Sequence, residues 1–472
     1  MNVLNDLQPQ GVMRWFEALC AIPHGSRDTK RVSDFCVAFA KERGLRCLQD
    51  AHNNVVIYAP ASAGYETHPT VILQGHLDMV CEKEPDCDID FAVDGLRLAH
   101  DDTYIYAEGT TLGGDDGIAV AYALAVLDDP TVRHPPLEVV FTVDEEIGML
   151  GADAMDMSVL SGRVLLNCDS EDEGILTVSC AGGATSALTK SLRTEAATAQ
   201  GWRVGVRGLT GGHSGVEINQ GRANANKTLA AVLASLPVRL SAINGGSKDN
   251  AIPRASEALL TSDAPDFAAR FASEAEKVRS ALPSGETAAE FYCEPAAVGT
   301  VLTAEDSAAL LALLNAVPNG VQAMSADIAG LVQTSLNLGI LKTEAERAIL
   351  TFSVRSSVNA EKTALIERLA ETGRQYGASY SESGAYPAWE YRRQSPLRDV
   401  MVACYERLYG KKPVVEAIHA GLECGIFSDR LKGLDAVSFG PQMHDIHTTR
   451  ERLDIASTSR TWDFLLAVLA AL

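Results

Sequence analysis

The sequence has few basic residues relative to acidic ones: 40 lysines and arginines against 62 aspartates and glutamates, for a formal net charge of −22. Such a surplus of negative charge repels a phosphate backbone, because binding to nucleic acid depends on lysine and arginine. We therefore exclude nucleic acid as a partner. Carboxylates that hold cations would add to this surplus, but a solvated acidic surface accounts for most of it.

Long apolar runs, a signal peptide and a cysteine motif are also missing. The longest apolar runs, around 118–127 and 464–472, are much shorter than the ~20 residues of a membrane span. Residues 1–6 have no basic segment followed by an apolar core, so a secretory signal is not expected. The 10 cysteines include no C-x-x-C pair, which favours reduced, buried thiols. These absences predict a cytoplasmic protein with no membrane partner.

The chain is long enough for two domains, because 472 residues exceed what one hydrophobic core usually supports. In its first part, helical patterns alternate with apolar strand patterns, which predicts an α/β domain with an open mixed sheet and helices on both faces. The expected helices are 11–21, 29–43, 117–127 and 397–409, and the expected strands are 54–58, 70–74, 137–143, 163–167 and 436–439.

The pattern changes after Gly183 and returns to its earlier form from about Tyr386. Between these points, strand-like segments at 202–206 and 349–354 alternate with helical runs at 222–236, 267–282 and 360–376. We therefore predict that a discontinuous domain, 1–182 and 381–472, surrounds an inserted α+β domain, 183–380.

The strand 70–74 leads into Gly75-His76-Leu77-Asp78, and its alternation puts His76 and Asp78 on the same side of the chain. A histidine can bind a metal ion through one ring nitrogen while a carboxylate accepts the proton of the other nitrogen. Taken alone, this pair is weak support for a metal site, because a structural histidine is the commoner explanation.

Four further polar segments lie where predicted strands end or a predicted helix begins. They are 111–117 with Asp115 and Asp116, 144–146 with Glu145 and Glu146, 168–171 with Asp169, and 440–447 with His444 and His447. An aspartate before a helix is also a common N-cap, and a run of carboxylates is also a common solvated turn. In an open α/β sheet, however, the strand ends meet at one edge where functional groups gather. Two histidines and several carboxylates there predict two divalent metal ions, because one ion needs fewer ligands.

The motifs H-L-D, G-G-D-D-G, D-E-E-I-G, N-C-D-S-E and a late histidine resemble those of the cocatalytic zinc peptidases, a family of tripeptidases, carboxypeptidase G-like enzymes and aminoacylases. Residues 209–215, 222–227 and 419–425 are similar to the aminoacyl-histidine (Xaa-His) dipeptidases within it. The resemblance spans nearly the whole chain. It implies hydrolysis of unblocked dipeptides, including carnosine-like substrates, with two Zn²⁺ per subunit, for which Mn²⁺ or Co²⁺ can substitute.

Carried over residue by residue, the resemblance implies a role for each site residue. The implied metal ligands are His76, Asp115, Glu146, Asp169 and His447, with Asp115 bridging both ions beside a cis peptide bond to Asp116. Asp78 would orient His76, Glu145 would be the general base, and His213 would stabilise the oxyanion. The implied substrate contacts are Arg355 at the terminal carboxylate, Asn250, Asn337, and Glu423 at the free amino group. His447 is preferred to His444 because a short polar stretch and a glutamate follow it, as in the family.

The insert resembles the duplicated lid of the dipeptidase subgroup, which would exclude water and limit substrate length. Whether His213 acts in its own chain or across a homodimer stays open. One alternative is a related tripeptidase or N-acyl amino acid deacylase. Another is a non-catalytic zinc-binding protein that keeps the fold; Glu145 argues against it, because a structural site needs no unliganded carboxylate beside its ligands.

Overall fold

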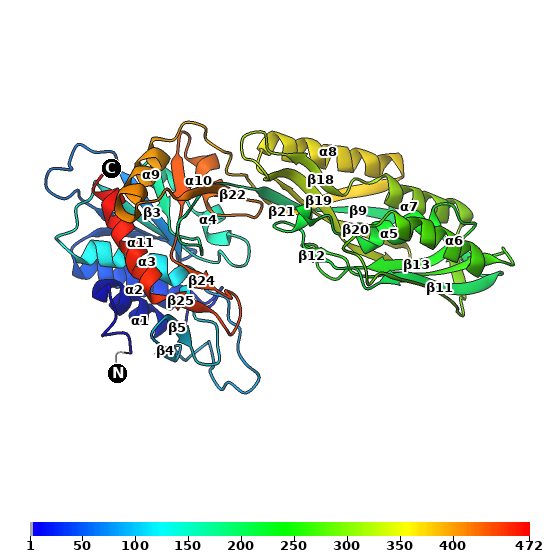
Figure 1. Ribbon diagram of the computed structural model, residues 1–472, viewed down its shortest axis with the longest axis horizontal. Coiled ribbons are helices and arrows are strands. Elements are labelled where there is room, and N and C mark those ends of the chain that lie inside the picture. The colour runs from blue at the N-terminus through cyan, green and yellow to red at the C-terminus, as the bar shows by residue number, and fades with distance from the viewer. Residues whose placement is uncertain (1–2) are drawn as a thin grey trace. The chain divides into compact units, whose positions relative to one another are not determined.

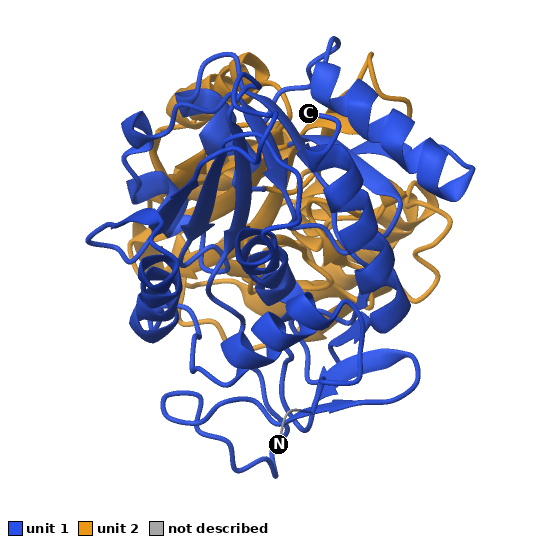
Figure 2. Ribbon diagram, turned by 90° about the vertical axis from the view of Figure 1, so that its left-hand side faces the viewer, with its two compact units in different colours: residues 1–180, 389–417, 422–472 blue, residues 181–388, 418–421 orange. Residues whose placement is uncertain are grey.

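The computed structural model describes residues 3–472, which fold into two compact units (Figures 1 and 2). Unit 1 comprises the chain up to Cys180 together with Trp389–Ala417 and Leu422–Leu472. Unit 2 comprises Ala181–Ala388 and the short return Ile418–Gly421, which the predicted division of the chain did not include. Within residues 3–472, no helix is both long and apolar enough to cross a lipid bilayer.

An eight-stranded mixed sheet forms the centre of unit 1. In order across the sheet, its strands are β1 (Arg46–Gln49), β2 (Val55–Ala59), β6 (Leu137–Thr142), β3 (Val71–His76), β7 (Val164–Asn167), β23 (Asp435–Ser438), β8 (Ile175–Cys180) and β22 (Val414–Ile418). The strands β6, β3, β7 and β23 are parallel, whereas β1, β2 and β8 pair antiparallel with their neighbours. The predicted mixed sheet is thereby confirmed.

Helices cover both faces of this sheet (Figure 2). They are α1 (Gln10–Cys20), α2 (Lys30–Glu42), α3 (Gly114–Asp128), α4 (Leu150–Ala154), α9 (Pro396–Tyr409), α10 (Cys424–Arg430) and α11 (Ile455–Leu469). Helix α3 packs on both α1 and β3, so it is buried all round from Ile118 to Val126. The predicted strands and helices of this unit match the observed ones within a few residues.

The central strands of unit 1 are completely buried, as expected for parallel strands that helices cover on both faces. Apolar residues such as Ile72, Leu73 and Phe141 fill the core along them. The same strands bring polar residues into the interior where they end. His76, the last residue of β3, is only 1% exposed.

A nine-stranded antiparallel sheet forms unit 2. Its strands are β16 (Glu290–Pro295), β11 (Gln200–Arg207), β15 (Ser256–Ser262), β13 (Arg239–Gly245), β19 (Val332–Glu344), β20 (Arg347–Ser356), β9 (Gly182–Ser191), β21 (Ala378–Tyr386) and β18 (Gly320–Met324). Burial alternates along β20, because one face of the sheet packs on helices. The helices of this unit are α5 (Ala225–Leu233), α6 (Phe267–Ser280), α7 (Ala304–Ala316) and α8 (Asn359–Gln375).

Helix α5 begins later than the predicted helical run 222–236. The side chain of Asn224 accepts hydrogen bonds from the backbone N–H groups of Asn226 and Lys227. Asn224 is therefore the N-cap of α5, because its side-chain oxygen satisfies donors that have no partner within the helix.

Candidate metal centre

The predicted ligands of unit 1 gather at the carboxyl edge of the parallel strands. His76 ends β3, Glu146 follows the end of β6, and Asp169 follows the end of β7. Parallel strands end at the same edge, so these three side chains converge. Asp115 joins them from the start of α3, and His447 from the segment between β24 (Met443–His444) and β25 (Arg452–Asp454).

Asp115 lies between the two histidines. Its Oδ1 is 3.1 Å from His76 Nε2, and its Oδ2 is 3.0 Å from His447 Nε2. Each histidine has a second carboxylate: Asp169 Oδ1 is 3.7 Å from His76 Nε2, and Glu146 Oε2 is 3.0 Å from His447 Nε2. One carboxylate thus links two sets of ligand atoms, which is the arrangement that a pair of metal ions requires.

Asp116 also belongs to this cluster, although it was not predicted as a ligand. His76, Asp116 and Asp169 form one group whose ligand atoms lie within 4.8 Å of one another, and His76, Asp115 and Glu146 form another. Asp116 Oδ2 accepts the backbone N–H of His76 at 3.2 Å, so this oxygen supports the end of β3. The peptide bond between Asp115 and Asp116 is cis.

Asp78 supports the site differently from the prediction. The Nδ1 of His76 lies 2.9 Å from the Asp78 backbone carbonyl and 3.6 Å from its carboxylate, so the carbonyl is the hydrogen-bond acceptor. The carboxylate instead accepts the backbone N–H groups of Glu145 at 3.0 Å and Glu146 at 3.4 Å, and the hydroxyl of Ser26 at 2.8 Å. Asp78 therefore connects the end of β3 to the carboxylates that follow β6.

The electrostatics of the cluster favour bound cations. Burial raises the pKa of the carboxyls of Glu145 and Asp169 well above their usual range, and burial also raises that of Glu146. Hydrogen bonds to Asp115 and Glu146 raise the pKa of His447 to about 11. Within residues 3–472, the buried Oε1 of Glu146 has no hydrogen-bond partner. Buried carboxylates and imidazoles with spare acceptor atoms suit divalent ions, so the residues fit a metal centre.

His213 of unit 2 has a defined donor and acceptor nitrogen. Its Nδ1 accepts the backbone N–H groups of Gly215 and Val216, both at 3.2 Å. The proton of a neutral ring therefore lies on Nε2. Burial and the charge of Arg355 lower the pKa of His213, which favours that neutral form.

The predicted substrate contacts differ in their surroundings. Arg355 Nη1 donates to the hydroxyl of Tyr386 at 3.2 Å, and its buried Nε has no partner within the described chain. The side chain of Asn250 is exposed. Asn337, in contrast, is 1% exposed, and its Nδ2 donates to the backbone carbonyls of Asp249 and Ala251. These bonds occupy both of its N–H groups, so we replace its predicted substrate contact by a role in the fold.

Glu423 of unit 1 is completely buried. It accepts hydrogen bonds from Gln74 Nε2 at 2.5 Å and Thr142 Oγ1 at 2.6 Å, while its Oε1 has no partner among the described residues. Burial raises its pKa to about 7. A substrate amine reaches this carboxylate only if neighbouring side chains move, and the predicted contact stays a prediction.

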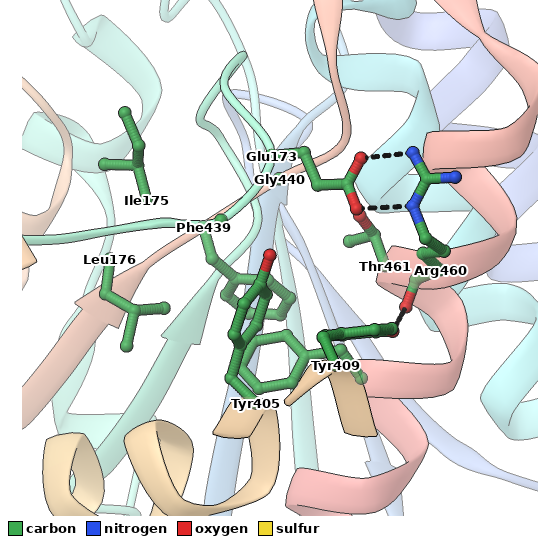
Figure 3. Close-up of a pocket in the computed structure, with 11 residues that line it drawn as sticks. Glu173, Ile175, Leu176, Tyr405, Tyr409, Phe439, Gly440, Arg460 and Thr461 are labelled. Carbon is green, nitrogen blue, oxygen red and sulfur yellow. Dashed lines mark hydrogen bonds and ion pairs between the residues drawn. The ribbon is translucent and has the colours of Figure 1, made fainter. Parts of the chain in front are cut away.

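A small cavity of unit 1 includes none of the predicted ligands in its lining (Figure 3). Rings such as Tyr405 and Phe439 form its wall beside the ion pair of Glu173 with Arg460. Its volume is about 10 Å³, which holds one water molecule at most. This cavity is too small for a dipeptide.

Comparison with known proteins identifies the family of the chain. The chain matches peptidase family M20/M25/M40 over residues 72–471. It is 36% identical over 479 residues to the cytosol non-specific dipeptidase of Escherichia coli (strain K12), covering 99% of both chains. The crystal structure of aminoacylhistidine dipeptidase from Vibrio alginolyticus matches with a TM-score of 0.94 at 37% identity, covering 99% of this chain and 98% of that one.

A more distant structure, aminopeptidase PepT from Bacillus cereus, matches with a TM-score of 0.57 at 14% identity over 98% of this chain and 99% of that one, and shows the fold alone. The family resemblance inferred from the motifs is confirmed by the family match and by the relatives that span the chain. The chain is a metallopeptidase that belongs to peptidase family M20/M25/M40.

Proposed function

We propose that this protein hydrolyses the peptide bond of unblocked dipeptides, including Xaa-His substrates such as β-alanyl-histidine. The observation that carries the proposal is the position of Asp115, whose two carboxylate oxygens each lie near a different histidine. The names of the relatives that match along the whole chain, a non-specific dipeptidase and an aminoacylhistidine dipeptidase, support the substrate class.

In this proposal, His76 and Asp169 would hold one ion, His447 and Glu146 would hold the other, and Asp115 would serve both. Zinc is the proposed metal, with Mn²⁺ or Co²⁺ as substitutes, because the ligand atoms are imidazole nitrogens and carboxylate oxygens. Two bound divalent ions would polarise the scissile carbonyl and make a water molecule more acidic.

Glu145 is the proposed general base. Its carboxylate takes a proton from the attacking water as the water oxygen bonds to the carbonyl carbon. The same carboxyl then gives this proton to the amine nitrogen as the C–N bond breaks. The Asp78 carboxylate supports Glu145 for this role, because it holds the backbone N–H groups of Glu145 and Glu146.

His213 and Arg355 are the proposed groups of unit 2 that bind the reacting substrate. His213 would donate its Nε2–H to the oxyanion, because its Nδ1 is already an acceptor. Arg355 would bind the C-terminal carboxylate, which a guanidinium can hold through two hydrogen bonds.

Removal of the metal is expected to abolish hydrolysis reversibly. Treatment of the full chain with a chelator should stop cleavage of β-alanyl-histidine, and added zinc should restore it. A panel with a free dipeptide, a tripeptide and an N-acetylated amino acid tests the substrate class in the same assay. Cleavage of the N-acetylated compound but of no dipeptide would contradict the proposal and favour a deacylase, and preference for the tripeptide would favour a tripeptidase.

Replacement of Arg355 by methionine is expected to raise KM for a dipeptide about tenfold to a hundredfold, because a hydrogen-bonded charge pair is lost. A dipeptide amide, which lacks the carboxylate, should be cleaved equally by both proteins. Arg347→Met is the matched control, because the exposed Arg347 begins the same strand and pairs with Glu344. An equal rise in KM for the dipeptide amide would show that Arg355 does not bind the C-terminal carboxylate of the substrate.

A cytosolic location is also proposed, in line with the name of the Escherichia coli relative. Formation of a homodimer stays open, and the lid function of the insert stays a prediction. Light scattering of the purified protein measures its oligomeric state. A monomer would exclude the action of His213 across subunits.

A further inference from the structure

A buried carboxylate lies directly behind the proposed bridging ligand. Glu451 is 3% exposed, and it accepts hydrogen bonds from the backbone N–H groups of four consecutive residues. Its Oε2 accepts from Leu112 at 2.8 Å and Gly113 at 3.1 Å. Its Oε1 accepts from Gly114 at 2.8 Å and Asp115 at 3.3 Å. A single side chain therefore organises the whole turn that leads into Asp115.

The glycines of this turn allow the carboxylate to approach. Gly113 has φ of +66°, a left-handed conformation that glycine adopts without strain. A Cβ on Gly114 would lie 3.2 Å from Glu451 Oε1 and 3.1 Å from the sulfur of Met443. The N–H groups at the start of a helix have no partner within it, and a negative charge there is favourable. The G-G-D-D-G motif is thus shaped to receive a carboxylate.

Glu451 also lies four residues after His447, in the segment between β24 and β25. His447 has φ of +59°, a conformation that residues other than glycine keep only where their surroundings hold them. Its Nε2 contacts Asp115 Oδ2 at 3.0 Å. The segment between β24 and β25 therefore contacts the turn before α3 at two places. His447 contacts Asp115, and Glu451 accepts the amides of residues 112–115.

We propose that Glu451 is a positioning residue that holds Asp115 and His447 at the separation required by the ion they share. The inference rests on the proposed two-metal function and deepens it. His76 is the last residue of β3, and Asp169 follows β7 by two residues, so strands of the central sheet fix the backbone at both ligands. His447 lies in an irregular segment and depends on the contacts of that segment. Loss of Glu451 should therefore weaken mainly the ion bound by His447 and Glu146.

The test is a zinc titration of the metal-free full chain by calorimetry, with wild type compared to Glu451→Gln. Glutamine keeps the size of the side chain but turns an N–H₂ group toward two backbone N–H donors. The second zinc equivalent should bind at least about tenfold more weakly, the usual loss when a group that orients a ligand is removed. The first equivalent should be weakened much less, because His76 and Asp169 lie at the ends of strands of the central sheet.

Glu138→Gln is the matched control. Glu138 is 4% exposed and accepts hydrogen bonds from Ser161 N–H and hydroxyl and from Gly162 N–H, near the start of β6. Glu138 accepts a comparable set of hydrogen bonds, but it lies near the start of β6, whereas Glu145 follows the end of β6. The Glu138→Gln variant should therefore keep both zinc equivalents. Gly114→Ala is a second test, because its Cβ presses on the Glu451 carboxylate without removing it, and it should also weaken the second equivalent.

Hydrogen exchange of the metal-free protein provides a readout that is independent of zinc. The amides of residues 112–115 should exchange faster in Glu451→Gln than in wild type or Glu138→Gln. Wild-type zinc affinities in Glu451→Gln, or the same loss in Glu138→Gln, would overturn the positioning role while leaving the proposed function intact. A wild type that binds fewer than two zinc ions would contradict both.

Discussion

Replacement of Glu145 by glutamine is expected to reduce kcat by about 10³-fold, within the range that general acid–base catalysis contributes. Glutamine has nearly the same shape but cannot take the proton of the attacking water. The backbone bond from Glu145 N–H to Asp78 does not involve the changed side chain, so the fold of the segment should persist. Elemental analysis should find the same zinc content as in wild type, and KM should change little.

Asp144→Asn is the control for this variant. Asp144 belongs to the same run of carboxylates, but its side chain accepts the backbone N–H of Arg27 and it is not a proposed ligand or base. Its turnover should stay near that of wild type. Substantial turnover by Glu145→Gln at full zinc occupancy would remove Glu145 as the base. A loss of zinc in Glu145→Gln would instead place Glu145 among the ligands.

Asp115→Ala is expected to have the largest effect on metal binding, because both proposed ion sites lose a ligand in one substitution. Each remaining set would keep a single histidine and one carboxylate of the predicted ligands, which is fewer than the three protein ligands typical of a catalytic zinc ion. Elemental analysis should find little or no zinc after dialysis, and hydrolysis of β-alanyl-histidine should fall to the level of a reaction without enzyme.

Asp128→Asn is the matched control, because Asp128 lies at the opposite end of helix α3 from Asp115 and pairs with Arg43. That variant should keep both ions and normal turnover. If Asp115→Ala retained two zinc ions, the bridging position of Asp115 would be wrong. If it retained one ion, Asp115 would serve a single site.

Much of the catalytic fold could be predicted because local patterns and burial agree there. The strands β3 and β6 consist mostly of apolar residues, and they are buried along their length. Helix α3 has an apolar sequence from Ile118 to Val126, which is typical of a fully buried helix, and all of these residues are buried. The strands of unit 2 were harder to predict: most residues of β13 and β18 are only partly buried or exposed, and pairing with other strands makes these two segments regular.

Individual side-chain roles were predicted less completely than the positions of the motifs. We expected Asn337 to contact the substrate. Its side-chain N–H groups instead donate to the backbone carbonyls of Asp249 and Ala251, which lie 88 and 86 positions away. Asp78 was expected to contact the ring of His76 through its carboxylate, which instead holds the turn after β6. Such partners lie far apart in the sequence, so spacing could not reveal them.

The sequence by itself determined which chemical groups this protein brings to its candidate metal centre, because histidines and carboxylates follow strands whose ends must meet at one edge. Only the tertiary structure decided how these groups are divided between the two proposed ion sites. It puts Asp115 between His76 and His447, which are 371 positions apart in the chain numbering. It also places Glu451 against four amides that lie more than 330 residues earlier. Hydrogen bonds act over about 3 Å, so they depend on proximity that only the folded chain creates.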